Sequence, residues 1–165
     1  MQSGVLKAAV LIGVLLLTTR AGATGMDLHW LWDNRCAECH GHSAEFARKF
    51  LQVKNDRLQG RHHDENFRLF LRNHYVSTNE VDAVYEMLLA QVRTEPRFKR
   101  ECGNCHGQAS TFVRRAMLLQ NGVLISRESR QPIRRFMADH RGLQADDIEF
   151  FVNLLTRVAG EVYQP

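Results

Sequence analysis

Two copies of one short motif constrain the fold of this chain more than any other feature of its sequence. Each copy has the form Cys-x-x-Cys-His, and the two copies use all four cysteines of the 165 residues. The motif residues are Cys36, Cys39 and His40 in the first copy and Cys102, Cys105 and His106 in the second. An ungapped alignment of residues 36–74 with residues 102–140 gives twelve identities in thirty-nine positions. We therefore expect one small structural unit to occur twice in tandem.

The N-terminus has the pattern of an export signal over residues 1–23. Lys7 precedes an apolar run at residues 8–17, which is shorter than the roughly 20 residues that a membrane span needs. Ala21 and Ala23 form a small-x-small site, so we expect cleavage after Ala23. Retention of the segment as an uncleaved membrane anchor is the alternative. We predict an exported protein with no membrane span in the mature chain.

Four kinds of cysteine chemistry are possible for an exported chain of this type. A disulfide within each Cys-x-x-Cys pair would close a very small loop and stabilise little. A thioredoxin-like redox pair normally occurs once, beside a strand–helix pattern that this sequence does not show. A four-cysteine zinc site would not require a histidine after each pair. Covalent haem attachment does require it, because the two thiols bond to the haem vinyl groups and the histidine binds iron. The duplicated motif therefore predicts two haem c groups.

The second axial ligand of each iron is predicted from the internal alignment. Among the histidines outside the motifs, only His74 and His140 occupy matching positions, each thirty-four residues after its motif histidine. We predict that His40 and His74 bind one iron and that His106 and His140 bind the other. Methionine is the rival ligand, and Met137 could replace His140 in the second site alone. The adjacent histidines at 62 and 63 have no counterparts in the second copy and are interpreted as surface residues.

The spacing of apolar residues predicts short helices and no strand, so the expected fold class is all-α. The expected helices cover residues 45–53, 64–74, 77–92, 110–119, 131–140 and 145–160. Ser77 and Glu80 have capping-box spacing, Pro132 lies near a helix start, and Gly160 is expected to end the last helix. The charged stretch around Pro96 is the expected junction. The predicted organisation is a signal peptide at 1–23, a first haem c unit at 24–95 and a second at 96–165.

The double motif makes the chain resemble the c-type cytochromes. Its size, signal peptide and matched non-motif histidines are most similar to the small dihaem cytochromes c of bacterial periplasms. The resemblance implies a tandem of small cytochrome c-like helical units, each wrapped around one covalently attached haem with bis-histidine ligation. It also implies a periplasmic location. Its implied partners are a membrane quinol-oxidising donor and a soluble cytochrome acceptor. Larger tandem cytochromes with histidine–methionine ligation fit less well, since no methionine recurs between the copies.

Electron transfer is the expected function, and the protein is not expected to be an enzyme. An iron that is bound by two strong protein ligands has no open position for a substrate. The alternative is a haem enzyme or a gas or redox sensor with one displaceable axial ligand. Nucleic acid is not an expected partner, because loss of Lys7 and Arg20 with the signal would lower the formal charge from +4 to +2. A nucleic-acid-binding domain would carry a strongly basic surface instead.

Overall fold

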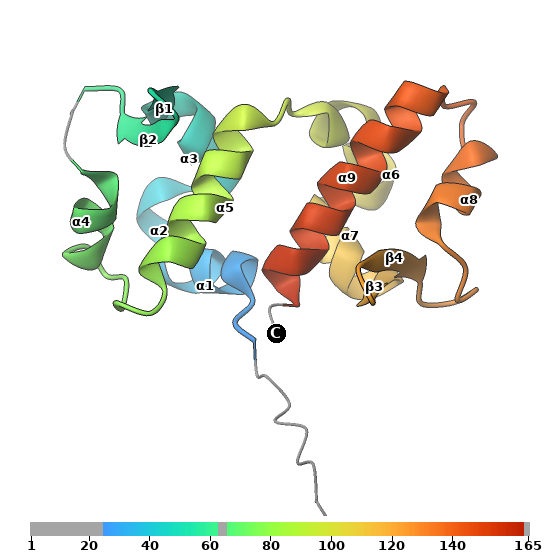
Figure 1. The fold of residues 1–165 in the computed structure, drawn as a ribbon, viewed down its shortest axis with the longest axis horizontal. Helices are drawn as coiled ribbons and strands as arrows, with labels where there is room; N and C mark the ends of the chain where they lie inside the picture. The colour runs from blue at the N-terminus through green and yellow to red at the C-terminus, as the bar shows by residue number, and fades with distance from the viewer. Residues whose placement is uncertain (1–24, 63–65, 164–165) are drawn as a thin grey trace, which may run out of the picture.

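The computed structural model describes residues 25–62 and 66–163. They form two halves that lie side by side, with the long helices of the two halves next to each other at the centre (Figure 1). The first half contains α1 (Leu28–Arg35), α2 (Ala37–His40), α3 (Ser43–Phe50), β1 (Leu51–Lys54), β2 (Arg57–Gly60), α4 (Phe67–Arg72) and α5 (Val81–Arg93). The second contains the π-helix η1 (Phe98–Cys102), α6 (Gly103–His106), α7 (Ala109–Ala116), β3 (Met117–Gln120), β4 (Val123–Ser126), α8 (Ile133–Ala138) and α9 (Ala145–Val162).

The duplication seen in the sequence is also present in the fold. Six elements of the first half, from α2 to α5, recur in the same order as α6 to α9 in the second. Each half has its own cluster of buried apolar side chains, centred on α5 in the first half and on α9 in the second. The unit boundaries at 24–95 and 96–165 remain predictions, and the predicted signal peptide at 1–23 lies outside the described residues.

The prediction of an all-α fold is wrong, because each half contains a two-stranded antiparallel hairpin. The helices that we expected over residues 45–53 and 110–119 end at Phe50 and Ala116, and the chain continues directly into β1 and β3. The fold is largely helical, with β1 paired to β2 and β3 paired to β4. Periodicity misled the prediction because the apolar residues of helix and strand follow each other without a polar break.

Both hairpins turn through two residues with positive φ. These residues are Asn55 and Asp56 in the first hairpin, at 49° and 57°, and Asn121 and Gly122 in the second, at 49° and 76°. Positive φ at both central residues is the signature of the type I′ turn, whose twist matches that of the flanking strands. Asn-Gly between apolar segments is a strong hairpin signal, so the sequence did contain the information that the all-α prediction overlooked.

The remaining predicted helices are present, with shifted ends. α4 and α8 lie inside the ranges 64–74 and 131–140, and α8 begins directly after Pro132, as expected. α5 begins later than predicted, at Val81, and the backbone N–H of Ser77 donates to the Glu80 carboxylate at 2.9 Å. The prediction that Gly160 ends the last helix is wrong. α9 continues to Val162, which is buried in the second cluster, so packing outweighs the low helix propensity of glycine.

Polar contacts join the two halves next to the packed helices α1 and α9. His29 on α1 and Glu161 on α9 are both buried, and their side chains meet at 2.8 Å. Asp27 accepts two hydrogen bonds from the Arg114 guanidinium, at 2.6 and 2.8 Å. Burial raises the pKa of Asp27, but the bonds from Arg114 and from the Trp30 backbone outweigh it and leave the pKa below its usual range. The carboxylate is therefore ionised at neutral pH, and this charged bond ties the halves together.

No helix in the described part of the chain has the length and apolar character that a membrane crossing requires.

The second hairpin provides a direct test of the turn geometry. Replacement Gly122→Ala should lower the free energy of unfolding by about 1–2 kcal/mol, because a side chain at positive φ is strained. A Cβ added to Gly122 would meet no atom within 4 Å, so strain is the only expected cause. Urea denaturation followed by far-ultraviolet circular dichroism measures the change. Asp56→Gly, at the matching position of the first hairpin, is the control. An equal loss of stability in Asp56→Gly would contradict the interpretation that strain at positive φ destabilises Gly122→Ala.

Candidate functional site

In the first half, the structure brings the side chains of His40 and His74 close together. His40 ends the short helix α2, and His74 lies just after α4. The backbone N–H of His74 donates to the Leu71 carbonyl at 3.0 Å, which fixes the chain beyond the end of the helix. The centroids of the two imidazole rings are 5.8 Å apart, with 56° between the ring planes. Two residues that are far apart in sequence thus form one pair.

The second half repeats this arrangement with His106 and His140. The ring centroids are 6.0 Å apart, and the planes are inclined by 52°. His106 ends α6, and His140 follows α8. The backbone N–H of His140 donates to the Met137 carbonyl at 3.1 Å, as His74 does to Leu71. The structure therefore places together both pairs of histidines that the alignment matched, whereas their binding of iron stays a prediction.

The separation of the rings suits one metal ion between them. A metal–imidazole nitrogen bond is about 2 Å long, and the nitrogen lies about 1 Å from the centre of its ring. Two such ligands on opposite sides of one ion therefore have centroids about 6 Å apart. The observed values of 5.8 and 6.0 Å agree with this arrangement.

The electrostatic environment keeps the motif histidines neutral. Burial lowers the pKa of His40 below its usual range, and the neighbouring His74 lowers it further. The pKa of His106 is lowered first by burial and then by His140, Arg115 and Arg141. Neutral imidazole is the form that binds a metal ion, so both sites favour the ligating state at neutral pH.

The four cysteines are free thiols in the structure. Cys39 and Cys105 are exposed, whereas Cys36 and Cys102 are partly buried. Burial raises the pKa of Cys36 and of Cys102. A catalytic redox pair needs a thiol of lowered pKa, so these environments disfavour the thioredoxin-like interpretation.

Aromatic side chains frame the first pair of histidines. Phe46 contacts the His40 ring at 4.7 Å between centroids, and Phe70 stacks on His74 at 4.7 Å and 23°. Beside them lies a cavity of about 460 Å³, and its lining includes Phe46, Phe50 and Phe70. Phe50 and Phe70 expose 46% and 42% of their surface, which is unusual for large apolar residues unless a further group covers them.

The second pair has a similar frame with different residues. Phe112 lies 4.2 Å from His106 between ring centroids, and Phe136 stacks on His140 at 5.0 Å and 29°. Phe136 is 58% exposed. In both halves, therefore, an exposed aromatic ring one helical turn before the distal histidine lies against the imidazole. A flat apolar cofactor between the paired imidazoles would cover these rings, so the residues present fit a haem.

The other candidate ligands lie elsewhere. Met137 is buried in the second apolar cluster, 8% exposed, as expected for core filling. His62 is exposed at the rim of the first cavity, and residue 63 lies outside the described residues. Within the described ranges, no group of three or more histidine, cysteine, aspartate or glutamate side chains is arranged to hold a metal ion. Each imidazole pair is therefore a candidate site with two ligands.

Sequence reasoning missed one contributor to each site. Trp32 donates from Nε1 to the Gly41 carbonyl at 2.8 Å, and its ring lies 5.3 Å from Phe46. Its counterpart in the second half, Phe98, lies 6.0 Å from Phe112. Because the two residues differ in type and precede the aligned segment, the alignment gave no signal for them. The matched glycines after the motifs were a usable signal, since Gly41 has a φ of 67°.

No protein-family model, curated protein or solved structure matches this chain.

The cysteine chemistry can be tested by intact mass spectrometry of protein produced in a host with haem-attachment machinery. The native chain should carry the mass of two haems. The double variant Cys36→Ala/Cys39→Ala and its counterpart Cys102→Ala/Cys105→Ala should each carry one. Denaturation before the measurement removes non-covalent groups. A native mass without haem, or a native mass lower by the hydrogens lost in two disulfides, would contradict this prediction.

Proposed function

We propose that the protein is an electron carrier with two covalently bound, six-coordinate haem c groups. His40 and His74 would bind one iron, and His106 and His140 the other. Thioether bonds would form at Cys36, Cys39, Cys102 and Cys105. One observation carries the proposal: both halves bring a motif histidine and a distal histidine to a separation that suits one ion.

Each part of the site has a physical role in this function. The four histidines would hold the two irons with two protein ligands each, so water and substrates would find no open coordination site. The aromatic rings at Phe46, Phe70, Phe112 and Phe136 exclude water beside the imidazoles and hold their orientation. Arg61 at the rim of the first cavity supplies a cation for the acidic groups of the cofactor. The haem itself supplies reversible one-electron chemistry.

The absence of an open position distinguishes a carrier from the alternative of an enzyme or a sensor. Haem catalysis and gas sensing need a vacant or displaceable ligand. His74 is backed by the stacked ring of Phe70 and by a backbone hydrogen bond to Leu71, and His140 has the same two supports. These supports oppose displacement of either distal ligand.

The proposal also includes the cellular location of the protein and its redox partners. The pattern at residues 1–23 is that of an export signal, and covalent haem attachment suits an exported chain. We therefore place the carrier in the periplasm, between a membrane quinol-oxidising donor and a soluble cytochrome acceptor. Two haem sites in one small protein would form a short relay between such partners.

Removal of one distal ligand tests the proposed coordination. His74→Ala should open one iron, so the reduced protein should bind about one carbon monoxide per two haems, whereas the native protein binds none. His140→Ala should give the same result in the other half. The Soret band, titrated with carbon monoxide, reports the binding.

His62→Ala is the matched control, because His62 is an exposed histidine at the rim of the same cavity as His74. Like the native protein, the reduced His62→Ala variant should bind no carbon monoxide. Carbon monoxide binding to the native protein, or to His62→Ala alone, would contradict the assignment of the distal ligands.

A further inference from the structure

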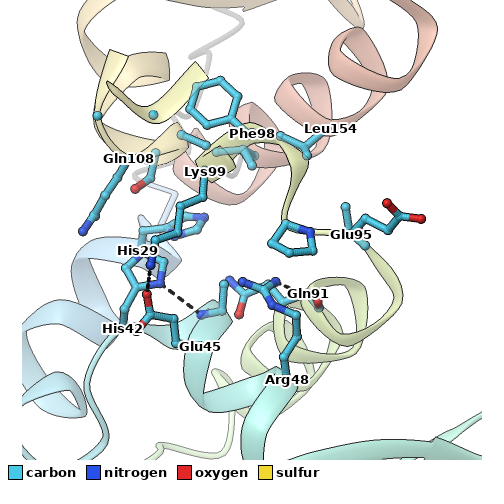
Figure 2. A pocket seen from close by; sticks show the side chains of 18 of the residues that line it. His29, His42, Glu45, Arg48, Gln91, Glu95, Phe98, Lys99, Gln108 and Leu154 are labelled. Atoms are coloured by element: carbon cyan, nitrogen blue, oxygen red, sulfur yellow. Dashed lines mark hydrogen bonds and ion pairs between the residues drawn. The ribbon is translucent and has the colours of Figure 1, made fainter. Parts of the chain in front are cut away.

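A second cavity, of about 400 Å³, lies between the two halves and includes none of the proposed haem ligands. Figure 2 shows Glu45, Arg48 and Gln91 of the first half on one side, facing Phe98, Lys99 and Leu154 of the second. Its volume is within the range of small-molecule sites, roughly 300–1,000 Å³. Three features of its lining indicate what it could bind.

The first feature is a buried hydrogen-bond acceptor with no donor. Gln91 is 4% exposed, and its Nε2 donates to the Ser43 hydroxyl at 3.0 Å. Its Oε1 has no hydrogen-bond partner in the described part of the chain. A buried amide oxygen without a donor is unfavourable, so a ligand with an O–H or N–H group would stabilise it. The fold does not require an amide here. The equivalent contacts Ser77–Glu80 and Gln144–Asp147 align α5 with α9 so that Val158 occupies the matching position in the second half.

The second feature is a cationic side chain, Arg48, that has no ion pair among those of the described residues. Arg48 donates from Nη1 to the Gln91 carbonyl at 3.3 Å, and among the described residues it forms no ion pair. The nearby Glu45 pairs with Lys99 instead. Burial lowers the pKa of Arg48, and Glu45 only partly offsets this. Its counterpart Arg114 has Asp27 as a partner, so the missing anion is specific to Arg48.

The third feature is an apolar wall opposite these polar groups. Phe98 and Leu154 face the cavity from the second half, and Pro96 and Val158 extend the apolar lining. An anion that carries an apolar body could place its charge at Arg48 and its body against Phe98 and Leu154. A strongly polar ion such as phosphate would leave this wall without a partner.

We propose that this cavity binds a small carboxylic acid that carries a hydroxyl or amino group beside its carboxylate, together with an aromatic or aliphatic body. The carboxylate pairs with Arg48, and the neighbouring O–H or N–H donates to Gln91 Oε1. Hydroxy acids and amino acids share this chemistry. The inference does not depend on the proposed haem function, because no proposed haem ligand lines the cavity.

Isothermal titration calorimetry of the purified protein with three related compounds tests the site. Phenyllactate carries the hydroxyl, phenylalanine carries the amino group, and 3-phenylpropanoate carries neither. Binding of phenyllactate or phenylalanine at least about tenfold tighter than that of 3-phenylpropanoate is expected, since only the former pair supplies a donor to Gln91. The tighter of the two identifies the donor as O–H or N–H. Absence of heat with all three compounds, or equal binding of all three, would overturn the proposal.

Variants assign the binding to the named residues. Gln91→Met removes the acceptor at similar volume, and Arg48→Gln removes the charge. Each variant should raise the Kd of the preferred compound by at least about tenfold. Arg57→Gln removes an exposed arginine outside the cavity and should bind like the native protein. Unchanged binding in the Arg48 variant, or equal weakening in the Arg57 control, would overturn the proposal even where Gln91→Met fails to fold.

Discussion

The opposition of two imidazoles within each half is the constraint on which the rest of the structure depends. His40 and His74 are separated by thirty-four residues, yet their rings lie 5.8 Å apart, and the second half reproduces this at 6.0 Å. To bring them together, the chain must reverse direction between the motif and the distal histidine. The hairpin β1–β2 makes that reversal, and α4 then returns the chain toward α2. The hairpins are therefore needed to bring the paired histidines together.

The two halves share this geometry but differ in what surrounds it. The first half has Phe50 beside its cavity, whereas the matching residue in the second half is Ala116. The first has Trp32 beside its motif, and the second has Phe98. Differences of burial and hydrogen bonding around a haem change its reduction potential. In the proposed carrier, these substitutions would give the two haems unequal potentials and a preferred direction of electron flow.

Much of the site, but less of the fold, could be predicted from the sequence. The pairing of the histidines could be predicted because duplication kept His74 and His140 in register while their neighbours diverged. The hairpins were missed because Phe50 and Ala116 end their helices without a polar break, although Asn121–Gly122 was a clear turn signal. The cavity between the halves could not be predicted. Arg48 and Leu154 line one cavity only through the packing of the halves, which leaves no local pattern in the sequence.

The proposed electron carrier requires that two histidines bind each of two irons. The near-infrared magnetic circular dichroism spectrum of the oxidised native protein tests it most directly, because the charge-transfer bands identify the axial ligands of each haem. Bis-histidine ligation should give bis-imidazole bands for both irons and no other band. A methionine–iron band would mean that Met137, and not His140, binds the second iron. A high-spin signal would reveal an open iron, and either result would contradict the coordination on which the proposed electron carrier rests.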